Sequence, residues 1–124
     1  MAPRDFPEAL TFRNQLDALS VKFVADYRLG DALACTDAYT KDGLLLLPNA
    51  APIRGRTEIA AALTTGMDAG LEVSGITTIE SGADEKYGYA IQTVHRSRGD
   101  QIVMLALRCE HGIWRICAQG VMAA

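Results

Sequence analysis

The sequence predicts an α+β fold in which helices cover one face of a curved antiparallel sheet. Three observations support this prediction. Residues 1–70 contain three segments with helical patterning and one short apolar strand. Residues 71–124 have strand patterning throughout, and turn signals divide them into four runs. A separation of helices from a set of consecutive hairpin-linked strands is typical of α+β proteins.

The length and composition fit one globular domain. The chain has 124 residues, and we assign residues 1–8 to an N-terminal tail and residues 9–124 to a single domain. Hydrophobic residues make up 49% and charged residues 22%, which is enough apolar material for a core and unlike a disordered chain. The formal net charge of −3 argues against a nucleic-acid partner, because binding to phosphates requires a basic surface.

The sequence gives no signal for a membrane span, secretion or a metal. No apolar run approaches the roughly 18 to 20 residues of a membrane helix. The first ten residues, MAPRDFPEAL, lack the apolar segment of a secretory peptide, so we expect a cytoplasmic protein with no membrane partner. Cys35, Cys109 and Cys117 have no paired spacing, which argues against disulfides and zinc. We therefore expect no metal site and no cofactor.

The first two predicted helices meet at a corner. The first covers residues 9–29, because apolar residues recur every three or four positions at Phe12, Leu16, Leu19, Phe23 and Tyr27. Gly30 is expected to end this helix in a left-handed conformation. Asp31 is expected to cap a short second helix over residues 32–39.

A strand, a loop and a third helix come next. Residues 43–47 lack polar alternation, so we expect a strand that is covered on both faces. Residues 49–56 contain two breakers and are expected to form a loop. Thr57 is the expected cap of a helix that ends near Gly70 and whose apolar positions are Ile59, Leu63 and Met67.

The remaining chain predicts a four-stranded antiparallel meander. The expected strands cover residues 73–81, 86–96, 101–110 and 113–122. Short turn segments of the type found in hairpins separate them, at residues 82–84, 98–100 and 111–112.

The order of these elements, together with several local motifs, resembles the nuclear transport factor two-like superfamily, also called ketosteroid isomerase-like or SnoaL-like. The matching segments are YRLGD at 27–31, YTKDG at 39–43, PIRGR at 52–56 and GIWRI at 112–116. The resemblance implies a cystatin-like fold: a cone formed by the curved sheet, with a long N-terminal helix and two shorter helices on its concave side. It also implies an apolar pocket in the cone and a homodimer formed through the outer sheet face. Because this fold serves many functions, the resemblance alone does not assign one.

The catalytic positions of ketosteroid isomerases are apolar in this chain. Isomerases of this family use a carboxylate base, a tyrosine and an acidic donor, which hold and move protons next to a carbonyl. The corresponding positions here are Leu47, Phe23 and Met104. None of these side chains transfers protons, so the sequence argues against the isomerase mechanism. The Asp-Arg-Asp arrangement of the related epoxide hydrolases is also missing from the last two strands.

The pocket wall depends on strand register. A two-residue turn at residues 111–112 pairs Met104 with Gln119, Ala106 with Cys117 and Arg108 with Arg115. Side chains two apart share a face, so one wall would consist of Met104, Ala106, Arg108, Cys117, Gln119 and Val121. His95 joins this wall if the preceding turn has two residues, whereas a three-residue turn places Gln92 and Val94 there.

His95 and Tyr27 are the candidate catalytic residues. His95 is the one histidine expected within a strand, and histidine is the side chain type best suited to acid or base catalysis near neutral pH. Its alternative role is that of an exposed residue at a strand end. Tyr27 is a possible donor in the cavity, and its alternative role is that of a core tyrosine bonded to a backbone carbonyl. The expected ligand-binding residues are Phe23, Tyr27, Leu47, Met67, Met104, Arg108, Gln119 and Val121.

Three functions remain open at the level of sequence. The first is a domain that binds a small apolar ligand in the cone without chemistry. The second is an isomerase, cyclase or lyase that acts on a small hydrophobic carbonyl compound, with His95 as acid or base. The third is a protein-interaction module that uses an exposed apolar patch. An enzyme requires at least two polar groups that converge on one point in the pocket, so the geometry of the cavity separates the first two.

Overall fold

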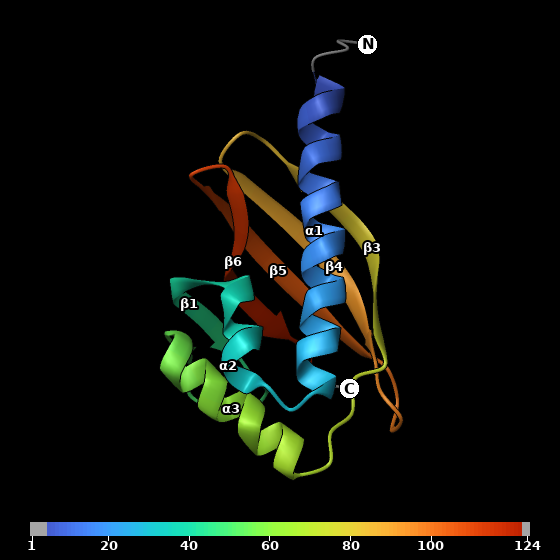
Figure 1. Cartoon of the computed structure of the whole chain (residues 1–124), viewed down its shortest axis with the longest axis vertical. Coiled ribbons are helices and arrows are strands. Elements are labelled where there is room, and N and C mark those ends of the chain that lie inside the picture. Colours follow the sequence, from blue (N-terminus) through green and yellow to red (C-terminus); the bar gives the residue numbers. More distant parts are fainter. Residues whose placement is uncertain (1–4, 123–124) are drawn as a thin grey trace.

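A six-stranded sheet forms the framework of the protein, seen here in a computed structural model that describes residues 5–122 (Figure 1). The strand order is β2-β1-β6-β5-β4-β3. β1 and β6 are parallel, and all other neighbours are antiparallel. The strands are β1 (Tyr39–Leu46), β2 (Ile53–Arg54), β3 (Gly75–Ala83), β4 (Tyr87–His95), β5 (Gln101–Glu110) and β6 (Ile113–Val121).

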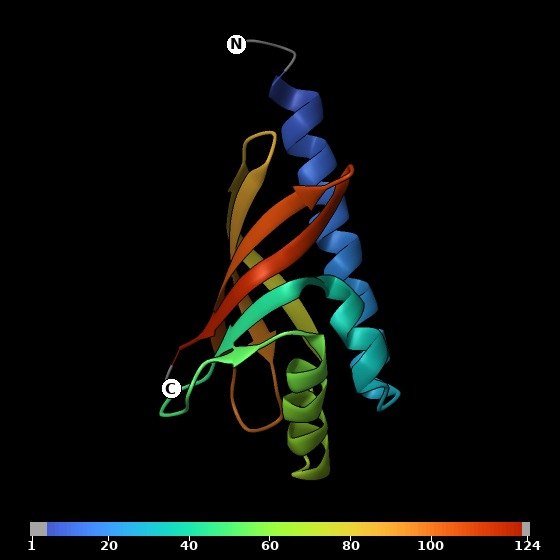
Figure 2. The ribbon, with the colours of Figure 1, turned by 90° about the vertical axis from the view of Figure 1, so that its left-hand side faces the viewer.

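The helices lie on one side of this sheet. The long helix α1 (Asp5–Arg28) crosses the concave face, and Figure 2 shows the strands curving around it. The short α2 (Ala32–Cys35), the 3-10 turn η1 (Thr36–Ala38) and α3 (Arg56–Asp68) gather toward one end of the cone. The α+β fold predicted from the sequence is therefore confirmed. No helix within residues 5–122 has the length and apolarity needed to cross a membrane.

The core lies between α1 and the inner sheet face. Phe12 and Leu16 of α1 are fully buried there, and the ring of Phe12 meets Trp114 of β6 edge-on with 4.7 Å between centroids. Phe12 also requires a glycine on β4: a Cβ on Gly88 would lie 2.7 Å from the Phe12 ring. This close approach fixes where the N-terminal half of α1 packs on the sheet.

The corner between α1 and α2 follows the sequence prediction. Gly30 has a φ of 74°, and the side chain of Asp31 accepts a hydrogen bond from the backbone N–H of Ala34 at 3.0 Å. The expected start of α1 at residue 9 was late, because residues 5–8 already form its first turn. Residues 1–4 of the expected tail lie outside the described residues.

Several boundaries around β1 differ from the prediction. The second helix is only one turn long, and β1 begins at Tyr39 instead of residue 43. The predicted loop contains β2, which pairs with β1. Thr57 is not the cap of α3: Gly55 occupies that position with a φ of 89° and no side-chain cap. The expectation that β1 is covered on both faces was also wrong for a single copy of the chain, because Leu46 is 43% exposed.

A β-bulge in the last hairpin corrects the predicted pocket wall. The two-residue turn is present, and Arg108 pairs with Arg115 as expected. Cys117 is then an extra residue in β6, so Gln119 pairs with Leu105 and Met104 pairs with Gly120. A one-residue shift moves every later side chain to the other face. The predicted pairs of Met104 with Gln119 and of Ala106 with Cys117 were therefore wrong.

Candidate functional site

The centre of the cone is almost filled. Between α1 and the inner face of the sheet there remains a cavity of about 30 Å³. That is the space of about one water molecule. Its lining includes Phe23, Tyr39, Gln92 and Gln119. The predicted ligand residues Phe23 and Gln119 therefore lie in the cone, at a point where little room remains.

Polar groups at this centre bond to one another. The hydroxyl of Tyr39 donates to Oε1 of Gln119 at 2.5 Å. Nε2 of Gln92 donates to the hydroxyl oxygens of Ser20 at 3.1 Å and Thr78 at 3.2 Å. Burial raises the pKa of Tyr39, so its hydroxyl stays protonated. These hydrogen bonds join β1 to β6 and join α1 and β3 to β4.

A larger chamber lies at the open end of the cone, with a volume of about 250 Å³. Aliphatic side chains from β1, α3, the segment after α3 and β6 form most of its wall, including Leu45, Leu47, Leu63, Leu71 and Val121. Its polar side chains are Tyr27, Arg96 and Gln101. Leu47 and Val121, both expected as ligand residues, thus meet in this chamber.

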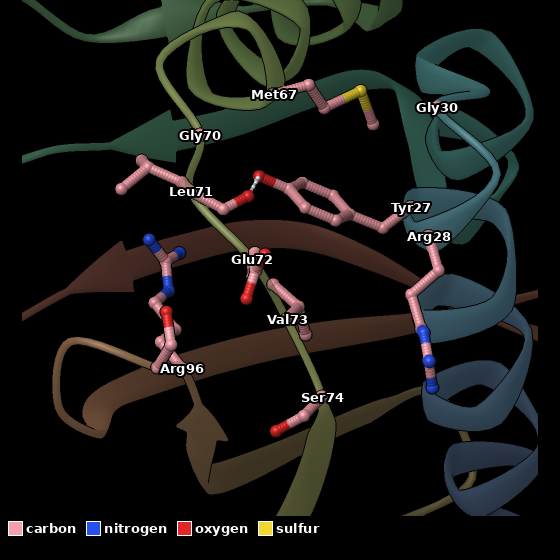
Figure 3. Close-up of a pocket in the computed structure, with 11 residues that line it drawn as sticks. Tyr27, Arg28, Gly30, Met67, Gly70, Leu71, Glu72, Val73, Ser74 and Arg96 are labelled. Atoms are coloured by element: carbon pink, nitrogen blue, oxygen red, sulfur yellow. Dashed lines mark hydrogen bonds between the residues drawn. The ribbon is translucent and has the colours of Figure 1, made fainter.

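A cleft of about 600 Å³ adjoins the chamber on the side of α1 (Figure 3). It lies between the end of α1, the end of α3 and residues 70–74. Met67 lines this cleft, as do Arg28 and Glu72. Tyr27, Leu71 and Arg96 line both the cleft and the chamber, so they form the boundary between the two spaces.

Tyr27 holds this boundary in place. Its hydroxyl donates a hydrogen bond to the backbone oxygen of Leu71 at 2.8 Å, as Figure 3 shows. Burial raises the pKa of Tyr27, and the positive charge of Arg96 acts in the opposite direction. Of the two roles left open by the sequence, this is the core tyrosine bonded to a backbone carbonyl. Its proton is not free for a substrate carbonyl.

His95 lies outside the cone. Val94 pairs with Gln101, which places Gln92 and Val94 on the inner face and His95 on the outer face. The His95 side chain is 38% exposed, with Nε2 2.7 Å from the Thr77 hydroxyl and Nδ1 3.2 Å from a carboxylate oxygen of Asp100. The connection over residues 95–100 is longer than either expected turn. Ile91 pairs with Met104, so His95 shares a face with Met104 as the two-residue turn predicted, but this face is the outer one and not the pocket wall.

Two other expected ligand residues also point outward. Met104 is 48% exposed on the outer face. Arg108 forms ion pairs with Asp42 at 3.1 Å and Glu110 at 2.9 Å. Val103, Leu105 and Leu107 are the buried residues of β5, so Met104 and Arg108 lie on its other face, and the prediction assigned the pocket wall to the wrong face of this strand. Within residues 5–122, no group of three or more His, Cys, Asp or Glu side chains is arranged to hold a metal ion.

Sequence reasoning missed Arg96, Gln101 and Leu71 as residues of the site. Arg96 directly follows β4, so a correct register for β4 and β5 would have placed it at the mouth of the cone. The position of Leu71 depends on how the chain returns from α3 to β3. No local pattern in the sequence encodes that path.

No family model and no curated protein matches the chain. A protein of unknown function with a cystatin-like fold from Nostoc punctiforme matches with a TM-score of 0.78 and 11% identity, over 90% of this chain and 76% of the other. A nuclear transport factor two-like protein with a cystatin-like fold from Novosphingobium aromaticivorans gives 0.70 and 15%, over 88% and 79%.

A third similar solved structure carries the name of the ketosteroid isomerases. It is a ketosteroid isomerase-like protein from Erwinia carotovora atroseptica, with a TM-score of 0.64 and 15% identity, over 86% of this chain and 93% of the other. At these identities the likeness concerns the fold and carries no activity. Strand order, helix placement and these matches agree: the chain has the cystatin-like, nuclear transport factor two-like fold, with a cone that is packed at its centre and hollow at its open end.

Proposed function

We propose that the chamber at the open end of the cone binds a small apolar molecule. The observation that carries this proposal is a space of about 250 Å³ whose wall is mainly aliphatic and which adjoins the 600 Å³ cleft. Ligand pockets are commonly apolar spaces of roughly 300 to 1,000 Å³ with a few polar groups. The chamber lies just below this range, which favours a ligand with a short apolar body.

Binding without chemistry is favoured over catalysis in the cone. The isomerase, cyclase or lyase alternative requires two polar groups that converge on one point in the pocket. His95 lies on the opposite face of the sheet, and the proton of Tyr27 is used by Leu71. Gln119 already accepts a hydrogen bond from Tyr39. No pair of the predicted catalytic groups therefore meets at a ligand.

We also propose that the outer sheet face pairs with a second copy of the chain. Two rows of apolar or small residues cross β1, β6, β5 and β4 on this face. The register gives Leu46, Gly120, Met104 and Ile91 in one row, and Leu44, Ala118, Ala106 and Tyr89 in the next. Gly120 in the first row and Ala118 and Ala106 in the second have no side chain or a small one, so a second sheet could approach closely there. Covering this face would also bury Leu46 and Met104, which are exposed in one chain.

An uncharged fluorescent probe tests ligand binding. N-phenyl-1-naphthylamine fluoresces strongly in apolar surroundings, so a chamber that binds apolar molecules should give a saturable increase with the wild-type protein. Ala62→Phe places a ring in the chamber and should weaken binding at least about tenfold. Ala61→Phe is the matched control, because Ala61 is the preceding residue of α3 and is exposed. Equal binding by both variants would contradict the proposal.

A further inference from the structure

We propose that the ligand of the chamber carries one carboxylate, and that this carboxylate binds to Arg96. This inference rests on the proposed function and adds the chemical class of the ligand. It follows from an arginine that stands at the boundary between an apolar chamber and the cleft.

Arg96 is partly buried and lacks the partners that such an arginine normally has. Its Nε atom is buried and has no hydrogen-bond partner. Among the ion pairs of residues 5–122, none includes Arg96. Native proteins pair nearly all buried donors, because an unsatisfied one costs free energy. An acceptor supplied from outside the chain would remove that cost.

The position of Arg96 matches the mouth of the chamber. Its side chain lines both the chamber and the cleft, and Figure 3 shows the guanidinium alongside Leu71. The positive charge of Arg96 lowers the pKa of Tyr27, so the guanidinium lies near the Tyr27 hydroxyl. Gln101 lines the same chamber and carries an amide that can donate. A ligand in the chamber could thus reach both groups with its polar end.

The chemistry of the chamber and of the cleft favours a carboxylate as the polar end of the ligand. A guanidinium presents two parallel N–H donors whose geometry matches the two oxygens of a carboxylate. The aliphatic wall of the chamber fits an uncharged body such as a short acyl chain or a ring. Glu72 also lines the cleft, and its negative charge repels a doubly charged group such as a phosphate more than it repels a singly charged carboxylate. A monocarboxylate with a small apolar body satisfies all three conditions.

A matched pair of ligands separates the carboxylate from the apolar body. Octanoate and 1-octanol have the same chain length and differ in charge. Each would be titrated against the protein loaded with N-phenyl-1-naphthylamine. For Arg96→Gln, the affinity for octanoate should fall about tenfold, as expected for loss of a charge-assisted hydrogen bond, whereas that for 1-octanol should change less than about twofold. Arg98→Gln is the control, since Arg98 is exposed in the same β4–β5 turn, and it should change neither affinity.

The outcomes distinguish this inference from the proposed function. If 1-octanol competes with the probe but Arg96→Gln leaves the affinity for octanoate unchanged, the carboxylate assignment is wrong. The proposal of an apolar pocket is then still supported. If neither ligand competes with the probe on the wild-type protein, both proposals are wrong. A salt titration of the wild-type protein gives the same answer should the Arg96→Gln variant fail to fold. Added salt should lower the affinity for octanoate and leave the affinity for 1-octanol unchanged. Equal effects of salt on the two affinities would overturn the carboxylate assignment.

Discussion

The hydroxyl of Tyr27 donates a hydrogen bond to the backbone oxygen of Leu71, 2.8 Å away, and so ties the end of α1 to the segment that follows α3. These two residues lie 44 positions apart in the chain. Both line the chamber and the cleft, so this single bond holds the boundary between the two spaces.

Tyr27→Phe should therefore destabilise the protein and loosen this boundary. Loss of one partly buried hydrogen bond is expected to lower the free energy of unfolding by about 1 kcal/mol. Urea denaturation measures this change. Tyr87→Phe is the matched control because Tyr87 is exposed on β4, and its effect should be close to zero. Equal effects of the two substitutions would mean that the Tyr27 bond contributes nothing.

The buried Tyr39 and the half-buried Gln119 should show strong coupling. Tyr39→Phe leaves Oε1 of Gln119 without its donor, and Gln119→Leu leaves the Tyr39 hydroxyl without its acceptor. Each single variant should lose about 1 to 3 kcal/mol of unfolding free energy, because an unpaired buried polar group is costly. The double variant should lose less than the sum of the two by about 1 kcal/mol or more, measured in a double-mutant cycle. Additive losses would contradict the coupling.

The hairpin between β3 and β4 should make stability depend on pH through Asp84. Its carboxylate accepts hydrogen bonds from the backbone N–H groups of Tyr87 and Lys86, at 2.9 Å and 2.8 Å, and these bonds hold the pKa of Asp84 below its ordinary value of 3.8. A carboxyl whose pKa is lowered by folding stabilises the protein above its unfolded-state pKa. This stabilisation is lost as the pH falls through the folded-state value.

Urea midpoints measured from about pH 6 down to about pH 3 should thus fall more steeply for the wild type than for Asp84→Asn. Glu85→Gln is the control, since Glu85 is the next residue and is exposed in the same turn. It should keep the wild-type slope. A wild-type slope in Asp84→Asn would show that these backbone hydrogen bonds do not stabilise the folded state.

Cys35 should resist alkylation while the chain is folded. Its side chain, at the end of α2, is buried against α1 with Sγ 3.8 Å from the backbone oxygen of Phe23, and burial raises the pKa of Cys35 to about 11. Because the thiolate is the nucleophile, little of it exists near neutral pH. Mass spectrometry after brief treatment with iodoacetamide should show modification at Cys117 before Cys35. Modification of Cys35 first would contradict its burial.

The outer sheet face should control the oligomeric state. Ala106→Lys places a charge at the middle of the second row of this face, between Ala118 and Tyr89. Light scattering should show a dimer for the wild type and a monomer for the variant. Ala61→Lys, on the exposed side of α3, should remain dimeric. A wild-type monomer would contradict the proposed pairing, and the face would then be open to a different partner.

Local signals predicted much of the fold. The corner at Gly30 and Asp31 depends on two adjacent residues, a left-handed glycine and a side-chain cap, and both roles are confirmed. The turn at residues 111–112 likewise set the register of Arg108 against Arg115. Such features could be predicted because each is determined within a few residues of sequence.

The site was harder to predict because it depends on long-range geometry. The extra residue at Cys117 puts Gln119 on the inner face of the sheet, opposite to the face of Met104, and no sequence signal marks that bulge. Arg96 belongs to the site because the segment between α3 and β3, at Leu71, lines the same chamber. The sequence showed that apolar residues occupy the catalytic positions of the isomerases. It did not show where in the cone the chamber lies.

A crystal structure of the protein with bound 1-octanol tests the central claim most directly. We predict that the alkyl chain lies in the chamber, in contact with Leu47, Leu63 and Val121, with its hydroxyl toward Arg96. An alkyl chain found on the outer sheet face, or a chamber that stays empty at saturating 1-octanol, would contradict the claim that this cone binds its ligand at the open end.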